Sequence, residues 1–325
     1  MNSSQLIIEK INSLAANQKA FLFIADFELK QPLVFEPHEF LQQKIQLEFP
    51  EFSFKSPKIT AACHSQYFSK SPIPFREYKS SFDKVKQHLH YGNSFLTNLT
   101  APTKIETNLT LSEIYQLAKA KYKISFQDKW ICFSPETFIQ IKQDKISTNP
   151  MKGTIDASVP NAEFIILNDQ KETAEHYTIV DLMRNDLSKV ATQVEVEKFR
   201  YIDRIKTNQK ELLQVSSKIT GQLPPDYLTH LGTILFDLLP AGSISGAPKC
   251  KTLDIIHEAE NYSRGYYTGA AFYFDGHNLD SCVLIRFIEK TPDGLVYKSG
   301  GGITVNSQAE NEYQELIDKV YVPGI

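Results

Sequence analysis

The segment Asn149-Pro150-Met151-Lys152-Gly153-Thr154-Ile155 places a lysine between two residues that restrict or free the backbone. It follows the alternating segment Phe138-Ile139-Gln140-Ile141, which is typical of a strand, so we expect the heptamer to form a bend after a strand. Pro150 has no N–H and Gly153 tolerates positive φ, which lets a ligand approach this backbone closely. Two interpretations of Lys152 stay open here. It is either a solvated surface lysine or a nucleophilic amine that partial desolvation and a neighbouring charge activate.

Composition bounds the class of protein. The 325 residues suffice for one large domain or two small ones, and 42% hydrophobic with 22% charged residues is ordinary for a globular protein. The net charge of −3, without a basic cluster, argues against nucleic acid or an acidic membrane surface as partners. No apolar run approaches the roughly 20 residues of a membrane span, and the first residues do not form a signal peptide. We therefore expect a cytoplasmic protein without a membrane partner.

The four cysteines are far apart and fit no metal-binding or redox spacing, so we expect reduced thiols: Cys63, Cys132, Cys250 and Cys282.

Apolar periodicity predicts an α+β protein with largely antiparallel sheets, because strand meanders and helices are interleaved along the chain. Helices are expected over residues 78–91, 111–122, 161–187, 209–223, 227–239 and 250–259. A final helix is expected to start at Ser307, where Ser307 and Glu310 have the spacing of a capping box.

Two pairs of glutamates recur at helical spacing. Glu172 and Glu175 share one face of a predicted helix, and Glu312 and Glu315 share a face of the final helix. They could be solvated helix faces with local ion pairs, namely Lys171 with Glu175 and Glu315 with Lys319. Alternatively, the two pairs face each other and hold a hard divalent cation, for which Mg²⁺ is well suited.

Several further segments suit an anionic ligand. Residues 242–249 place small hydroxyls before a helix, although the spacing is not that of a P-loop and Pro248 stands where its lysine would be. Gly300-Gly301-Gly302 is either a tight turn or backbone that approaches an anion. Arg286, in an otherwise apolar strand, is either paired internally or binds a carboxylate. Glu136 begins the strand that leads towards Lys152.

Together these segments resemble the chorismate-utilising enzymes: anthranilate synthase large component, aminodeoxychorismate synthase component I, isochorismate synthase and salicylate synthase. The matching segments follow the family order from about residue 78 to the end: 134–136, 150–154, 172–186, 242–249, 264–269, 285–286 and 300–319. The resemblance implies two largely antiparallel sheets packed in a sandwich with helices outside. It also implies a single chorismate-binding domain over 1–325, with about 1–77 as a shortened N-terminal segment and about 78–325 as the catalytic core.

Individual positions distinguish the family members. The aminodeoxychorismate synthases carry lysine in the P-x-K-G-T motif, as at Lys152, where anthranilate synthases carry alanine. Isochorismate and salicylate synthases have a water-activating lysine at the position that aligns with Leu96, so those activities are disfavoured. The chain departs from the family in two places. Leu96 replaces a common glutamine, and Gln214 stands where a histidine is frequent.

The resemblance also implies roles. Lys152 would be the nucleophile and Glu136 the general acid. Mg²⁺ would bind Glu175 and Glu315 directly and Glu172 and Glu312 through water. The substrate-binding residues would be Gly153, Thr154, Ser243, Gly300, Gly301 and Gly302, with Tyr267, Arg286 and Lys319 at the enolpyruvyl carboxylate.

The implied function is aminodeoxychorismate synthase component I, which aminates chorismate to 4-amino-4-deoxychorismate for 4-aminobenzoate and folate synthesis. Ammonia would come from a separate glutamine amidotransferase subunit. Two alternatives stay open. One is anthranilate synthase component I, and the other is a non-catalytic chorismate-binding paralogue, which the departure at Leu96 favours.

Overall fold

The structure, a computed structural model, describes residues 3–55, 67–206 and 211–324. Cys63 and the first residues of the predicted helix 209–223 lie outside the described residues.

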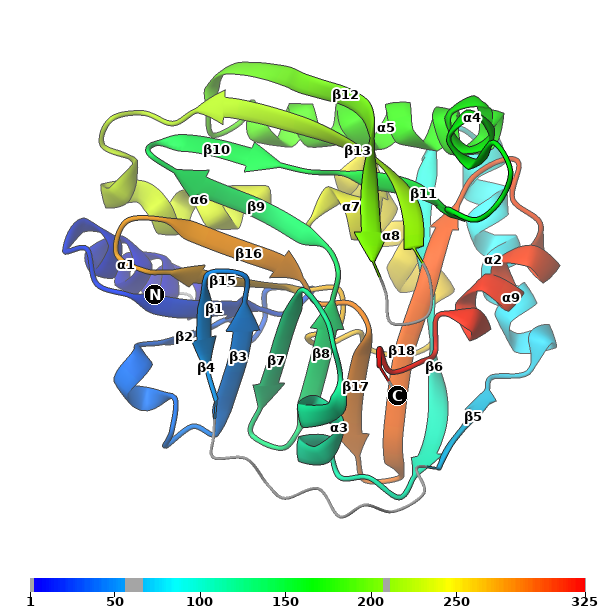
Figure 1. The fold of residues 1–325 in the computed structure, drawn as a ribbon, viewed down its shortest axis with the longest axis horizontal. Coiled ribbons are helices and arrows are strands. Elements are labelled where there is room, and N and C mark those ends of the chain that lie inside the picture. Colours follow the sequence, from blue (N-terminus) through cyan, green and yellow to red (C-terminus); the bar gives the residue numbers. More distant parts are fainter. Residues whose placement is uncertain (1–2, 56–66, 207–210, 325) are drawn as a thin grey trace.

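Two antiparallel sheets form the framework of the described chain (Figure 1). The first sheet runs in the order β11 (Met151–Asp156), β13 (Glu211–Gln222), β10 (Lys145–Thr148), β9 (Thr137–Lys142), β16 (Leu279–Val283), β15 (Ala270–Phe274), β1 (Phe21–Ala25) and β2 (Leu33–Phe35), with β12 (Thr192–Lys206) paired to β13. The second runs in the order β14 (Gly246–Ala247), β6 (Leu96–Thr107), β18 (Gly294–Ile303), β17 (Phe287–Thr291), β8 (Trp130–Ser134), β7 (Tyr122–Phe126), β3 (Ile45–Phe49) and β4 (Phe52–Phe54), with β5 (Phe68–Pro72) paired to β6.

Alternation along the strands builds a core between the sheets. In β1, Leu22 and Ile24 join one buried cluster, whereas Phe21 and Phe23 join a second cluster on the opposite face. The inter-sheet cluster is rich in aromatic rings, and the rings of Phe52 and Tyr273 stack with centroids 3.9 Å apart. The predicted sandwich of antiparallel sheets is confirmed. Because β1 lies inside the first sheet, the N-terminal segment is part of this core.

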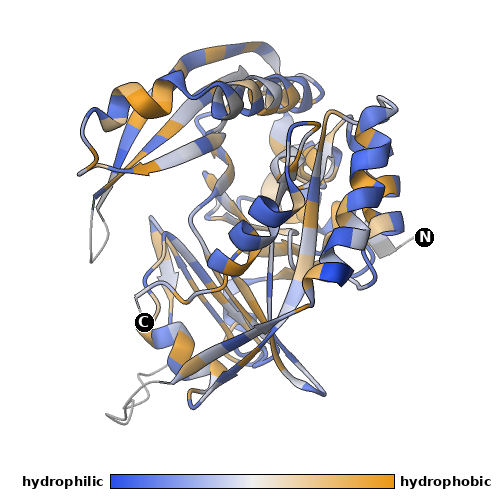
Figure 2. Ribbon diagram, turned by 90° about the vertical axis from the view of Figure 1, so that its right-hand side faces the viewer, coloured by the Kyte–Doolittle hydropathy of each residue, from blue (hydrophilic) through white to orange (hydrophobic). Residues whose placement is uncertain are grey.

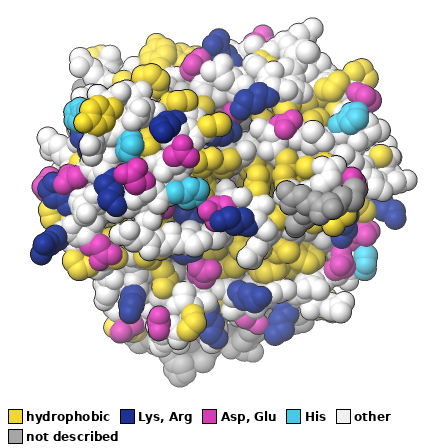
Figure 3. Space-filling model, turned by 180° about the vertical axis from the view of Figure 1, so that it is seen from behind, with side chains coloured by type: hydrophobic (Ala, Val, Ile, Leu, Met, Phe, Trp, Pro, Cys, Tyr) yellow, Lys and Arg dark blue, Asp and Glu magenta, His cyan; other side chains and the backbone are white. Residues whose placement is uncertain are grey.

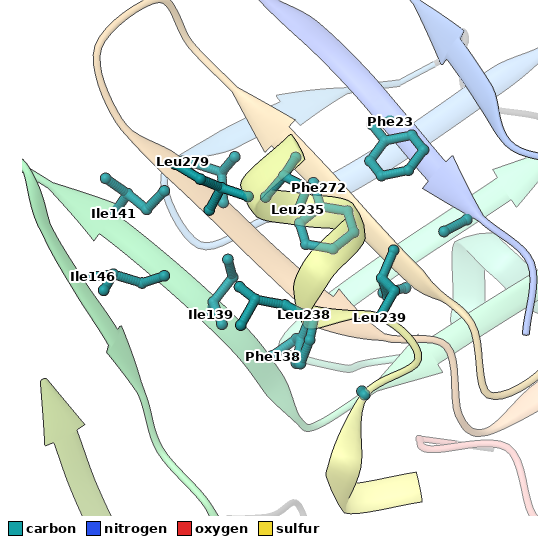
Figure 4. Close-up of a cluster of buried hydrophobic side chains, with 14 of the residues drawn as sticks. Phe23, Phe138, Ile139, Ile141, Ile146, Leu235, Leu238, Leu239, Phe272 and Leu279 are labelled. Carbon is teal, nitrogen blue, oxygen red and sulfur yellow. The ribbon is translucent and has the colours of Figure 1, made fainter. Parts of the chain in front are cut away.

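Helices cover the outer faces of both sheets. They are α1 (Ser3–Ala16), α2 (Phe75–His90), α3 (Leu111–Leu117), α4 (Ala162–Asn168), α5 (Gln170–Leu187), α6 (Leu231–Leu238), α7 (Gly242–Ser245), α8 (Lys249–Ala259) and α9 (Ala309–Asp318). Two short 3-10 helices, η1 (Pro37–Glu39) and η2 (Tyr227–His230), complete the described elements. Figure 4 shows Leu235 and Leu238 of α6 against Phe138, Phe272 and Leu279 of the first sheet. Helices α2, α8 and α9 pack on the second sheet, and their mixed hydropathy fits elements with one buried face (Figure 2).

One predicted helix is wrong. The stretch from Glu211 to Gln222 is strand β13, which pairs with β10, β11 and β12. Leu213, Val215 and Ile219 are buried at even spacing, and pairing with three strands outweighs the helical tendency of Glu211-Leu212-Leu213. The predicted single helix 161–187 is divided at Asp169, whose side chain accepts a hydrogen bond from the Glu172 N–H and so caps α5.

Two local predictions are also wrong. Helix α9 begins at Ala309 after the N-cap Gln308, so Ser307 does not cap it; Ser307 Oγ instead accepts a hydrogen bond from the Thr304 N–H at 3.1 Å. Arg286 lies between β16 and β17 rather than in a strand, with a left-handed φ of 56°.

No helix in the described part of the chain is both long and apolar enough to cross a membrane. On the face drawn in Figure 3, acidic and basic side chains are interspersed, in keeping with the small net charge.

Candidate active site

Lys152 lies in β11, at an irregularity in the pairing of β11 with β13 between Lys152 and Thr154. Gly153 takes φ of 78° there, a conformation that glycine adopts without strain. The bend predicted after a strand is therefore a bulge within a strand. The Lys152 side chain is 24% exposed, and its Nζ donates a hydrogen bond to Glu175 Oε2 at 2.9 Å. This contact does not fit the interpretation of Lys152 as a solvated surface lysine.

The charge of Lys152 is fixed by its neighbours. Burial alone would lower the pKa of this amine, but the carboxylate of Glu175, with those of Glu172 and Glu315, raises its pKa above the ordinary value. The activation expected for a nucleophile is thus absent while these carboxylates keep their full charge.

Helix α5 contributes the first pair of glutamates. Asp169 caps the start of α5 by accepting a hydrogen bond from the Glu172 N–H. Glu175 lies three residues after Glu172, about one helical turn, and 8% of its side chain is exposed. Glu172 Oε2 lies 3.4 Å from the point where a Cβ on Gly153 would sit. Glu172 therefore lies in contact with β11 at Gly153.

Helix α9 contributes the second pair. Glu312 and Glu315 both approach Gly301 of β18, with carboxylate oxygens 3.5 Å and 3.4 Å from the position of a Cβ there. Lys319, at the end of α9, donates hydrogen bonds to Glu315 Oε1 at 2.6 Å and to the Gly300 carbonyl oxygen at 2.9 Å. The predicted Glu315–Lys319 ion pair is present, whereas the Lys171 side chain lies outside the described residues.

Glu136 occupies the short connection between β8 and β9, where its N–H donates to Ser134 Oγ at 3.1 Å. Burial raises the pKa of the Glu136 carboxyl, and the nearby Ser243 hydroxyl and the charges of Lys152 and Arg286 offset only part of this effect. A buried carboxyl group that tends to keep its proton is suited to donate that proton to a leaving group.

Tyr267 and Arg286 provide donors on another side of the cavity. Burial raises the pKa of Tyr267, so its phenol keeps the proton. The Arg286 guanidinium lies over the ring of Tyr321, 5.5 Å from the centroid, and its Nε is buried without a hydrogen-bond partner among the described residues. An arginine held in this way can bind a carboxylate.

One cavity of about 400 Å³ brings these side chains together. All of the predicted site residues line it: Glu136, Lys152, Gly153, Thr154, Glu172, Glu175, Ser243, Tyr267, Arg286, Gly300, Gly301, Gly302, Glu312, Glu315 and Lys319. Residues far apart in sequence meet because β11 of the first sheet, β18 of the second sheet and α9 all contribute residues to this cavity. The roles assigned to these residues stay predictions.

The two departures from the family differ in position. Gln214 of β13 lines the cavity, and its Nε2 lies 3.5 Å from Thr154 Oγ1. Leu96 is buried and its Cδ1 lies 2.9 Å from the position of a Cβ on Gly302. Asn98 was not predicted as a site residue. It pairs with Gly302 in the sheet and lines the cavity two residues after Leu96 on the same face of β6. Period-two alternation from Leu96 is the signal that would have found it.

The acidic residues fit a hard divalent cation in their chemistry. Four carboxylates from two helices line one cavity, and a Cβ at position 153 or 301 would only touch their oxygens at 3.4–3.5 Å. The carboxylate oxygens of these four glutamates do not all lie within 4.8 Å of one another, as ligands of one ion would. Within the described ranges, the group with ligand atoms all within 4.8 Å is a different one, Glu36 with His38 and Glu39. The Glu39 carboxylate there accepts from the Glu36 N–H, which accounts for that cluster as a helix cap.

Comparison with known proteins agrees with this geometry. The pattern of the chorismate binding enzyme family matches residues 17–323. The chain is 47% identical over 322 residues to an uncharacterized PabA-like protein of Haemophilus influenzae, covering 99% of this chain and 98% of that protein.

Two further relatives are longer than this chain. Aminodeoxychorismate synthase component 1 of Bacillus subtilis is 30% identical over 265 residues, which cover 76% of this chain and 55% of the synthase. The crystal structure of anthranilate synthase component I from Streptococcus pneumoniae matches with a TM-score of 0.66 and 27% identity, covering 78% of this chain and 58% of that chain. The chain thus spans little more than half the length of either.

Proposed function

Because the chain belongs to the chorismate-binding enzyme family, we propose that it is an aminodeoxychorismate synthase component that aminates chorismate with ammonia. The observation that carries the proposal is Lys152, whose amine reaches into the cavity beside Glu175. A lysine at this position distinguishes the aminodeoxychorismate synthases, which the chain resembles, from the anthranilate synthases. The chain is 30% identical to an aminodeoxychorismate synthase component over 76% of its length and 34% identical to an anthranilate synthase component over 73%, so the choice between the two activities rests on Lys152.

In the proposed reaction, Lys152 Nζ forms a bond to C2 of the chorismate ring. Both ring double bonds shift by one position and the bond from C4 to its hydroxyl breaks, with Glu136 supplying the proton that lets the hydroxyl leave as water. Ammonia then attacks C4 and loses a proton, both double bonds return to their original positions, and the C2–Nζ bond breaks so that lysine leaves as an amine that takes up that proton. The products are 4-amino-4-deoxychorismate and free Lys152, with no change in oxidation state. An adduct on lysine divides one difficult substitution into two easier steps.

The remaining residues would hold the two substrate carboxylates. Ser243 and the N–H groups of Gly300, Gly301 and Gly302 would form the ring-carboxylate pocket. Tyr267, Arg286 and Lys319 would bind the enolpyruvyl carboxylate, and Gly153 and Thr154 would contact the ring near Lys152. All of them line the cavity, which supports this arrangement.

Mg²⁺ would be held by Glu175 and Glu315 directly and by Glu172 and Glu312 through water. When bound, it would orient the ring carboxylate and offset the negative charge of the site. Ammonia would come from a separate glutamine amidotransferase subunit, as the resemblance of the chain to aminodeoxychorismate synthase component I implies.

The test is product identification by mass spectrometry after incubation of the purified protein with chorismate, Mg²⁺ and ammonium at alkaline pH. We expect 4-amino-4-deoxychorismate. Anthranilate would assign the chain to the neighbouring activity. Absence of turnover, even after addition of a cognate glutaminase subunit, would contradict the proposal and favour the non-catalytic chorismate-binding paralogue.

A further inference from the structure

The two lysines of the cavity are both bound to glutamates that the proposed function assigns to Mg²⁺. Lys152 Nζ lies 2.9 Å from Glu175 Oε2, and Lys319 Nζ lies 2.6 Å from Glu315 Oε1. Each of the two glutamate pairs therefore has one member in contact with a lysine. Since Glu175 and Glu315 are the two expected direct ligands, the oxygens that a cation needs are already in contact with ammonium groups.

A divalent cation and two ammonium groups cannot share these oxygens at close range without strong repulsion, because the cavity is partly shielded from water. Either the lysines move or the cation binds poorly. Lysine can move, since its charge sits on a flexible four-carbon chain. Lys152 Nζ has space on the side of β18, where the point at which a Cβ on Gly302 would sit is 3.6 Å away.

We infer that Lys152 and Lys319 are exchangeable counterions of the acidic site, and that a divalent cation displaces both ammonium groups from Glu175 and Glu315. The inference rests on the proposed function, which names these two carboxylates as cation ligands. Before cation binding, the two ammonium groups offset half of the negative charge of the four glutamates. After it, the two amines are free to meet the substrate, Lys152 at the ring and Lys319 at a carboxylate.

The exchange gives cation binding a second consequence. A lysine held by Glu175 is a poor nucleophile because its amine donates to a carboxylate, and a lysine held by Glu315 has one donor fewer for the substrate. The same event that fills the cation site would therefore prepare both side chains. Neither would be prepared in a protein that holds chorismate alone.

The test measures cation binding and amine accessibility without chorismate. Mn²⁺ affinity would be measured by calorimetry for the wild type, Lys319→Met and Lys152→Met. Lys218→Met is the matched control, because Lys218 also pairs with a glutamate, Glu197, at 2.9 Å but does not line the cavity. Loss of a competing ammonium should tighten Mn²⁺ binding about tenfold in Lys319→Met, with the control unchanged. Equal or weaker binding in Lys319→Met would overturn the inference.

A second readout separates exchange from simple removal of a repelling charge. The wild type would be treated with an amine-reactive methylating reagent with and without saturating Mn²⁺, and labelled lysines would be located by peptide mass spectrometry. Exchange predicts that Mn²⁺ increases labelling of Lys152 and Lys319 and leaves Lys218 unaffected. Unchanged labelling of Lys152 and Lys319, or no measurable Mn²⁺ binding, would refute it.

Neither readout requires turnover. A protein that forms no 4-amino-4-deoxychorismate can still show the exchange, and an active enzyme can fail to show it, so the two proposals fail separately.

Discussion

Glu136 and Lys152 illustrate how neighbours assign chemistry to single residues in this cavity. Burial raises the pKa of Glu136, which favours the protonated acid, whereas carboxylates raise the pKa of Lys152 and favour the ammonium ion. Burial therefore shifts Glu136 towards the form that its proposed role requires. Lys152 reaches its reactive form only when the negative charge around it is reduced.

Replacing Glu136 by glutamine keeps the size of the side chain and removes the proton that it donates. We expect Glu136→Gln to lower kcat roughly 10²- to 10⁴-fold, with a much smaller change in KM for chorismate. In the wild type, activity should fall as pH rises through the raised pKa of Glu136, because the protonated form is the active one. This decline should be absent from the residual activity of the variant.

The measurement is the steady-state rate across pH at equal concentrations of free ammonia, so that the titration of ammonium does not mask that of the enzyme. A decline of the same midpoint in Glu136→Gln would contradict the role of Glu136.

The residue types in the cavity could be predicted from the sequence, but their pairings could not. The motifs name Lys152, Glu175 and Glu315, and the structure places all three around one cavity. Which carboxylate meets which lysine depends on the approach of α5 to β11 and on the end of α9, and these follow from tertiary packing. For the same reason, the apolar residues around Arg286 in the sequence do not predict its left-handed backbone conformation.

At the scale of elements, Gly300 and Gly301 of β18 differ in what they permit. A side chain on Gly300 would overlap the carbonyl oxygen of Leu99 in the paired strand β6. A side chain on Gly301 would instead meet the carboxylates of Glu312 and Glu315 at ordinary contact distance. Gly300 is thus required by the sheet, whereas an alanine at position 301 fits and places its methyl group beside the acidic residues.

This difference supplies a matched pair of variants. We expect Gly300→Ala to lower the free energy of unfolding by roughly 1–3 kcal/mol, because the clash is with backbone that can shift only together with the strand. Gly301→Ala should unfold at nearly the wild-type temperature and yet weaken Mn²⁺ binding, since its methyl group occupies space beside two ligands. Thermal unfolding and calorimetry of both variants are the measurements. Equal loss of stability in the two would contradict the distinction.

His176 connects two elements behind the cavity. It is 1% exposed on α5, and its Nε2 lies 2.7 Å from Oγ of Ser217 on β13. The Ser217 N–H donates to the carbonyl oxygen of Pro150, just before β11. The imidazole thereby links the helix that carries Glu175 to the strand that carries Lys152.

Burial lowers the pKa of His176 to about 4, and the charges of Arg200 and Lys152 act in the same direction. Between about pH 6.5 and pH 4 the unfolded chain binds a proton that the folded protein excludes. The free energy of unfolding should therefore fall as the pH is lowered through this range. Above about pH 6.5, His176 should not change the free energy of unfolding with pH. In His176→Gln this contribution should disappear, whereas the exposed His90→Gln should behave as the wild type. Chemical denaturation at pH 7 and pH 4.5 tests this, and an equal pH effect in wild type and His176→Gln would contradict it.

Elements with one clear period could be predicted, and those decided by their neighbours could not. Helix α2 shows three buried apolar side chains at helical spacing, Phe82, Val85 and Leu89, and was predicted correctly. Strand β13 contains leucine and glutamate at its start, which favour helix, and only its pairing with β10, β11 and β12 makes it a strand. The break between α4 and α5 depends on the cap formed by Asp169, which apolar spacing does not reveal.

At the scale of the whole molecule, the sandwich assembles one cavity from distant parts of the chain. The connection between β8 and β9 brings Glu136, β11 brings Lys152 and α9 brings Glu315, across both sheets. Composition could bound this protein only as globular, and periodicity only as α+β. The order of the motifs predicted the architecture, because several distant segments that match one family restrict which parts of the chain can lie next to one another in the fold.

The covalent role of Lys152 is the central claim, and it can be tested directly by trapping the adduct. Wild type and Lys152→Ala would be incubated with chorismate and Mg²⁺ without ammonia, quenched with acid, and digested for peptide mass spectrometry. We predict that the wild-type peptide containing Lys152 gains the mass of chorismate less one water, and that Lys152→Ala gains nothing and has lost most of its amination activity. Wild-type rates of 4-amino-4-deoxychorismate formation by Lys152→Ala would contradict the claim.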